Sequence, residues 1–163
     1  MKKIGIVMGS DSDLPVIQKA VDVLKELEIP YEVHIYSAHR TPEEARAFAV
    51  GAREADFGVL IAAAGMAAHL AGAIAANTTL PVIGIPCKGP VFDGMDALLS
   101  TVQMPTGIPV ATVAVNAGGN AALLAAQILA VADEDIRKKL DSKRAADAKK
   151  VLEKDAGVME KLS

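Results

Sequence analysis

The chain has 163 residues, of which 52% are hydrophobic and 23% are charged, which is enough for one well-buried core and too little for two ordinary ones. Its formal net charge of -3 leaves no basic excess to neutralise a nucleic-acid backbone. No apolar run approaches the roughly 20 residues of a membrane span, and the start shows no cleavable signal pattern, so we expect a cytoplasmic protein that acts on small molecules.

The single cysteine, Cys87, cannot form an internal disulfide, and the three scattered histidines show no zinc-ligand spacing, which predicts a reduced, metal-free protein. Aromatic residues make up only 3% of the chain, so alanine and aliphatic side chains must fill the core. Small side chains allow close helix contacts between subunits, although a coding bias toward alanine would produce the same composition.

Short apolar runs recur along the chain, and each is followed by turn residues and then by a helical pattern. Because these runs are apolar on both faces, they predict a parallel sheet that is covered by helices on both sides. The predicted strands are residues 4–8, 31–36, 57–62, 82–85 and 110–115.

The first predicted helix has an apolar stripe at Leu14, Ile17, Val21, Leu24 and Leu27, with Asp11, Ser12 or Asp13 available as its cap. In the second, Thr41 is expected to cap the helix, with Pro42 in the first position and Glu44 completing a capping box. Later helices are predicted at residues 67–76, 93–102 and 120–131.

From Asp133 onward the composition becomes charged, with a thin apolar stripe on an otherwise polar helix. We interpret residues 133–163 as a helical tail of a single catalytic domain that spans residues 1–163. The stripe must pack on something, and a neighbouring subunit is as good a candidate as the domain's own core. Its members are Ile136, Leu140, Ala148, Val151 and Leu152.

In an open parallel sheet, ligands bind beyond the carboxyl ends of the strands. Four loops at these strand ends are candidates for a ligand site: residues 9–13, 37–40, 63–69 and 116–120. The first offers hydroxyls and backbone N–H groups at a helix start, which suit a phosphate, and Asp13 can accept hydrogen bonds from ribose hydroxyls. Ordinary helix caps would show the same residues.

The second loop places the imidazole of His39, which titrates near neutrality, beside the guanidinium of Arg40, which can bind a phosphate or carboxylate. The alternative is a surface His-Arg pair before a capped helix. His69 could face the same crevice or be a satisfied buried histidine. We assign no function to His34, and we interpret Lys88 as incidental and the Gly118–Gly119 pair as a turn.

Together these loops resemble the bacterial N5-carboxyaminoimidazole ribonucleotide mutase family, also described as the catalytic subunit of phosphoribosylaminoimidazole carboxylase. The resemblance covers nearly the whole chain. It is carried by the segments MGSDSD at 8–13, SAHRTP at 37–42, GMAAHL at 65–70, QMPTGIP at 103–109 and NAALLA at 120–125.

The resemblance implies a flavodoxin-like three-layer α/β/α fold with an extra C-terminal helix, a homo-octamer, and no metal or organic cofactor. The implied reaction moves a carboxylate from the exocyclic nitrogen to carbon 4 of the imidazole in IMP biosynthesis. His39 matches the general acid and base and His69 a second active-site histidine. The positions that match substrate-binding residues are Ser10, Ser12, Asp13, Ser37 and Arg40. We expect carbon dioxide to be held between the two steps in a pocket near Gly65 and His69.

Relatives that use free carbon dioxide have a lysine at the position of Arg40 and an Arg-Ser-Asn type sequence in place of residues 66–69, so the chain resembles the mutase branch. Ala63 and Ala71 depart from the family pattern, which leaves local loop geometry open. The alternatives are a carbon-dioxide-dependent carboxylase and a flavodoxin-like module that binds a mononucleotide or flavin. The scarcity of aromatic residues argues against a flavin.

Overall fold

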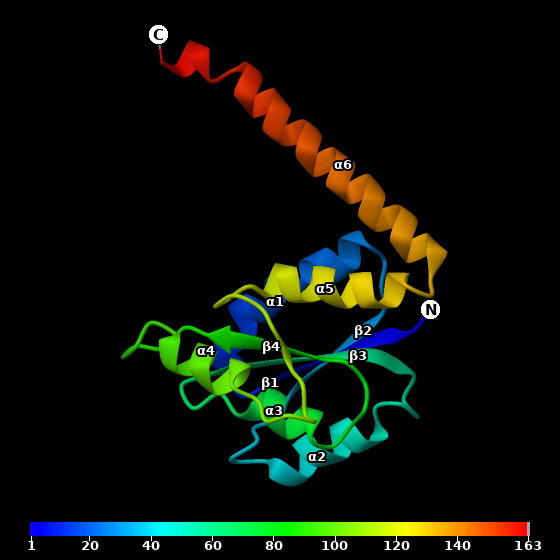
Figure 1. Ribbon diagram of the computed structural model, residues 1–163, viewed down its shortest axis with the longest axis vertical. Helices are drawn as coiled ribbons and strands as arrows, with labels where there is room; N and C mark the ends of the chain where they lie inside the picture. The colour runs from blue at the N-terminus through cyan, green and yellow to red at the C-terminus, as the bar shows by residue number, and fades with distance from the viewer. Residues whose placement is uncertain (163) are drawn as a thin grey trace.

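Five parallel strands form one sheet in the computed structural model, which describes residues 1–162 (Figure 1). The strand order is β2-β1-β3-β4-β5, which is the flavodoxin-like order and confirms the predicted fold class. The strands are β1 (Lys3–Met8), β2 (Tyr31–Ile35), β3 (Phe57–Gly65), β4 (Val82–Cys87) and β5 (Ala111–Thr112).

The last strand is much shorter than the predicted residues 110–115. After Thr112, the amide of Val113 still donates to the carbonyl oxygen of Gly84 at 3.1 Å, but the chain then turns away from the sheet. Asn116 takes a left-handed conformation with φ of 57° in this turn. The apolar run that suggested a longer strand therefore includes residues of the following loop.

The side chains of β1 alternate between two cores, as expected for a buried parallel strand. Ile4 and Ile6 pack with α1 (Leu14–Glu26) and α5 (Gly118–Ala130), whereas Val7 packs with α2 (Pro42–Gly51) and α3 (Leu70–Ala75). The remaining helix of the body, α4 (Met95–Val102), lies on the α3 side (Figure 1). These layers confirm the three-layer prediction.

Asp13 and Thr41 occupy the N-cap positions of α1 and α2, as predicted, but neither side chain makes the expected capping hydrogen bond. A short 3-10 turn, η1 (Asp11–Asp13), precedes α1, and the side chain that caps it is Ser10, whose Oγ accepts from Ser12 N at 3.3 Å. Thr41 does precede α2, but its hydroxyl accepts from Ser37 N at 2.8 Å and forms no cap. The helix starts follow the sequence pattern, while the hydroxyls have local partners that the pattern did not reveal.

Three later helices also differ from their predicted bounds because of local backbone geometry. The helix α3 begins at Leu70 because residues 66–69 form a tight turn, with Met66 at φ of 55°. The helix α4 begins at Met95 because Asp93 and Gly94 both have positive φ. The helix α5 begins at Gly118, two residues earlier than predicted, and ends at Ala130.

Gly118 is a packing residue, which corrects its interpretation as part of a simple turn. A Cβ atom at Gly118 would lie 2.0 Å from the carbonyl oxygen of Val16 on α1. Only a residue without a side chain allows α5 to approach α1 this closely. The contact fixes the position of α1, whose N-terminal end carries the loop after β1.

The charged C-terminal segment forms one long helix, α6 (Glu134–Ala156), and a short 3-10 turn, η2 (Met159–Lys161). Asp133 caps α6 by accepting from the amides of Asp135 and Ile136, both at 3.1 Å. Ile136 is buried in the core beside α5, but the helix then leaves the body (Figure 1). None of the helices within residues 1–162 has the length and apolar character needed to cross a membrane.

Candidate active site

A cavity of about 590 Å³ opens at the carboxyl ends of β1, β2, β3 and β4. It is therefore at the place where parallel sheets of this kind bind ligands. The eight residues that the family resemblance assigns to the site all line it: Ser10, Ser12, Asp13, Ser37, His39, Arg40, Gly65 and His69.

The loop after β1 is organised by a chain of short polar contacts. Ser12 Oγ lies 3.0 Å from Ser10 Oγ, which in turn accepts from the Ser12 amide and lies 3.2 Å from Asp11 Oδ1. The amide of Asp13 donates to the carbonyl oxygen of Ser10 at 3.2 Å. This turn presents two hydroxyls and a carboxylate to the cavity, a set that suits a phosphorylated sugar.

The loop after β2 is held by Ser37. Its Oγ accepts hydrogen bonds from the amides of His39 at 3.3 Å and Arg40 at 3.1 Å. The amide of Thr41 donates to the Ser37 carbonyl oxygen at 2.9 Å, which closes the turn. Ser37 thus fixes the backbone of the two neighbouring residues while their side chains stay exposed.

Arg40 connects the loops after β2 and β1. Its Nη2 donates to the carbonyl oxygen of Gly9 at 2.9 Å, across two neighbouring strands. This hydrogen bond orients the guanidinium beside Ser10, with its other N–H groups available to an anion. Arg40 and the β1 loop therefore form one anion-binding wall of the cavity.

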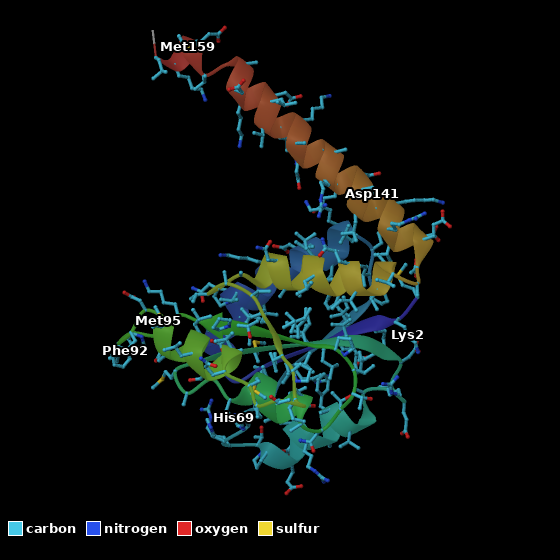
Figure 2. All side chains as sticks on the ribbon, viewed as in Figure 1. Lys2, His69, Phe92, Met95, Asp141 and Met159 are labelled. Carbon is cyan, nitrogen blue, oxygen red and sulfur yellow. The ribbon has the colours of Figure 1, made fainter. Side chains whose placement is uncertain are left out.

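His69 comes from the tight turn after β3. It immediately precedes α3, and Figure 2 shows it on the body beside that helix. The turn approaches β4 closely, since a Cβ atom at Gly65 would lie 3.3 Å from the Cys87 carbonyl oxygen. The imidazoles of His39 and His69 are both exposed, from loops on opposite sides of the β1 loop.

The fourth contributing loop is the one after β4, which sequence analysis did not select. Lys88, Gly89 and Pro90 line the cavity, whereas residues 116–120, which were selected, do not. Asn116 acts indirectly, because its Oδ1 accepts from the Lys88 amide at 2.9 Å. Lys88, which the sequence left without a function, thus lies in the cavity wall, and its position directly after a buried strand was the available signal.

His34, to which the sequence assigned no function, lies outside the cavity. Its ring stacks on Tyr36, with centroids 5.0 Å apart, and meets the edge of Phe48 on α2. The third histidine is therefore a packing residue. Within residues 1–162, no three His, Cys, Asp or Glu side chains come together in a way that could hold a metal ion.

Burial raises the pKa of two neighbouring groups, the Asp13 carboxyl in the cavity wall and the Cys87 thiol at the end of β4. It raises the pKa of the Asp13 carboxyl, although hydrogen bonds with the Cys87 thiol and the Ser10 backbone oppose the shift. Burial and the neighbouring Asp13 charge raise the pKa of Cys87 to about 12. Cys87 is therefore a neutral thiol beneath Asp13 at physiological pH, and it is a poor nucleophile.

Replacing Asp13 by Asn should raise thermal stability at neutral pH. Burial raises the pKa of Asp13 in the folded state above its value in the unfolded state. The protonated carboxyl therefore stabilises the folded protein below the unfolded-state pKa, and this stabilisation is lost as the pH rises through the folded-state pKa. The gain in melting temperature should therefore shrink below about pH 3.9, where wild-type Asp13 is also neutral.

Thermal unfolding of the wild-type protein and of the Asp13→Asn variant, each at neutral and at acidic pH, checks this prediction. The variant Asp11→Asn is the matched control, because it removes an equal charge from an exposed position in the same turn. A gain that is equal at both pH values, or equal in the two variants, would contradict the role of burial at Asp13.

The cavity combines two kinds of chemistry. Arg40, Lys88 and the hydroxyls can bind an anionic, hydroxylated ligand, and two imidazoles are available as general acids and bases. The arrangement suits an acid–base reaction on a phosphorylated small molecule.

Comparison with known proteins identifies relatives over nearly the full chain. The family model described as AIR carboxylase matches residues 3–150. An N5-carboxyaminoimidazole ribonucleotide mutase of Pyrococcus horikoshii is 52% identical over 159 residues, covering 98% of this chain and 89% of the relative. The mutase of Bacillus subtilis is 53% identical over 152 residues, covering 92% and 94%. The crystal structure of Treponema denticola PurE has a TM-score of 0.83 and 32% identity, covering 95% of this chain and 97% of that chain.

Proposed function

This chain belongs to the AIR carboxylase family, and on that premise we propose that it is a mutase that converts N5-carboxyaminoimidazole ribonucleotide into 4-carboxy-5-aminoimidazole ribonucleotide in purine biosynthesis. The observation that carries the proposal is the match with mutases of similar length, at more than half identity and over more than nine tenths of the chain. The cavity geometry supports the same chemistry.

His39 carries the proton in the proposed mechanism. Its imidazolium donates a proton to the carbamate nitrogen, the carbon–nitrogen bond breaks, and carbon dioxide and the neutral amine form. Carbon 4 of the electron-rich imidazole then attacks the carbon dioxide, and the new carbon–carbon bond leaves one proton too many on carbon 4. His39 takes this proton, which restores its starting state, so one residue serves as acid and then as base.

The anion-binding wall holds the ribonucleotide. The Ser10 and Ser12 hydroxyls and the Arg40 guanidinium surround the place for the phosphate, and Asp13 accepts hydrogen bonds from the ribose hydroxyls. Ser37 lines the cavity and also fixes the loop that carries His39, so it supports binding and proton transfer together.

Carbon dioxide is held between the two steps near Gly65 and His69. Gly65 lines the cavity at the end of β3, and its lack of a side chain lets a small ligand approach the backbone there. His69 borders this space from the start of α3. The cavity must retain the carbon dioxide, because a molecule that escapes into solution cannot be added to carbon 4 of the same nucleotide.

The second candidate within the family is a carboxylase that uses free carbon dioxide, since the family model carries that description. Purified protein should convert the carbamate nucleotide rapidly without bicarbonate. Aminoimidazole ribonucleotide with bicarbonate at low concentration should be a much poorer substrate. Equal or faster product formation from the second mixture would identify the carboxylase instead.

We also propose that the distal part of α6 packs on a neighbouring subunit, in a homo-octamer located in the cytoplasm. Val151 and Leu152 are 64% and 69% exposed in the single chain, and Met159 is 70% exposed. Exposed apolar side chains on a segment that leaves the body are an unfavourable arrangement in water. Assembly would bury it and would also help to exclude water from the exposed His39 and His69.

The double substitution Val151→Ser with Leu152→Ser should reduce the size of the assembly, because each lost apolar side chain removes about 1.5–3 kcal/mol of burial. Light scattering on full-length protein measures this against the mass of eight 16.9 kDa chains. The matched control, Lys149→Ser with Glu153→Ser, replaces two charged residues of the same helix segment without changing net charge. An unchanged assembly in the apolar variant would refute the packing proposal.

A further inference from the structure

Lys88 is the only lysine among the described residues that line the cavity, and the proposed mechanism leaves it without a role. We propose that Lys88 binds the carboxylate that the enzyme transfers, an inference that rests on the proposed function. In the free protein Asp93 holds this ammonium group at the rim, and the substrate carboxylate takes the place of Asp93 on binding.

The sheet register places Lys88 beside the pocket for the transferred group. Cys87 on β4 pairs with Gly65 on β3, so Lys88 begins the loop next to the turn that contains Gly65 and Met66. A Cβ atom at Gly89 would lie 3.6 Å from Met66 Cγ, so the two loops touch. The backbone of Lys88 is fixed by the hydrogen bond from its amide to Asn116.

The arginine and the lysine that line the cavity lie on opposite sides of it. Arg40 follows β2 and Lys88 follows β4, and three strand spacings of about 4.8 Å separate these strands by about 14 Å. A carbamate ribonucleotide also has two anionic ends, the phosphate and the carboxylate. With the phosphate beside Arg40 and Ser10, the carboxylate lies toward Lys88.

The partner of Lys88 in the free protein is easily replaced. Its Nζ lies 2.9 Å from Asp93 Oδ1, and the two side chains are 59% and 81% exposed. Ion pairs this exposed contribute little to stability because water competes with them. A carboxylate inside the cavity is less solvated, so its charge-assisted hydrogen bond to the ammonium group is stronger.

The loop between the two residues is shaped to bring them together. Asp93 and Gly94 have φ values of 53° and 94°, which turn the chain back toward Lys88 before α4 begins. Figure 2 shows Phe92 and Met95 of this segment at the edge of the body, beside α4. Asp93 therefore acts as a built-in counter-ion at the entrance of the cavity.

The test compares the carbamate nucleotide with aminoimidazole ribonucleotide, which lacks the carboxylate. Lys88→Met should raise KM for the carbamate nucleotide about tenfold or more, while calorimetric Kd for aminoimidazole ribonucleotide stays within about twofold of wild type. Lys25→Met removes an equal charge from an exposed position near the far end of α1 and should change neither value.

Asp93→Asn is the complementary variant. It removes the competing carboxylate, so it should lower KM for the carbamate nucleotide when Lys88 is present and have no effect when it is combined with Lys88→Met. An unchanged KM in Lys88→Met would overturn the proposal, and equal weakening of both nucleotides would place Lys88 at the shared phosphate and overturn it too. Failure of wild-type protein to turn over the carbamate nucleotide would instead refute the proposed function.

Discussion

Replacing His39 by Asn should lower turnover of the carbamate nucleotide by at least 10²- to 10⁴-fold, or about 3–5.5 kcal/mol in activation free energy. The loss should fall on kcat, because Asn cannot donate and then accept a proton at neutral pH. The folded structure should persist, since His39 is exposed and the loop is held through its backbone by Ser37. Steady-state kinetics and circular dichroism measure the two effects.

His34→Asn is the matched control for this variant, because it removes an imidazole that stacks on Tyr36 outside the cavity. It should retain turnover within a few-fold of wild type. If His39→Asn turned over at a near-normal rate, another group would have to carry the proton. His69 would then be the next residue to replace.

Replacing Gly118 by Ala should strongly destabilise the protein. The added Cβ would lie 2.0 Å from the Val16 carbonyl oxygen, and this obstacle is backbone, so α1 and α5 must move apart. Inserting atoms into a packed contact costs about 1–3 kcal/mol and occasionally more, and we expect the upper end here. The melting temperature should fall by about 6–12 °C for a chain of this length.

Gly119→Ala provides the control at the neighbouring position. The nearest atoms to a Cβ there are Val23 Cγ2 at 3.8 Å and Lys19 O at 3.9 Å, which are ordinary contacts. Alanine also favours the helix over glycine, so the change should be neutral or stabilising by less than about 1 kcal/mol. Equal melting temperatures for the two variants would contradict the assigned role of Gly118 in helix packing.

The sequence predicted the architecture well because burial leaves a strong pattern. Runs such as Val59 to Ala62 are apolar on both faces, and only a doubly covered sheet buries both. The predictions that did not hold concern which hydrogen-bond partner a polar side chain takes. Thr41 has the sequence of a helix cap, yet its hydroxyl bonds to Ser37, a competition that spacing alone does not decide.

The site, like the fold, was predicted where the sequence carries a local pattern and missed where the position depends on contacts between distant residues. Ser10, His39 and Arg40 were selected because they stand in polar loops after strands, and the structure places them around one cavity. Lys88 was missed because it follows β4 without a recognisable motif, and its position depends on the register between β3 and β4. Gly118 was misinterpreted because its close neighbour, Val16, is distant in sequence.

The fate of the transferred carboxylate distinguishes the proposed mutase reaction from carboxylation by dissolved carbon dioxide. Carbamate nucleotide labelled with ¹³C in the carboxylate is converted in the presence of excess unlabelled bicarbonate, and the product is analysed by mass spectrometry. Transfer within the cavity, with carbon dioxide held near Gly65 and His69, predicts that the product keeps the label. Product that carries mainly unlabelled carboxylate would contradict the mutase mechanism and indicate carboxylation from solution.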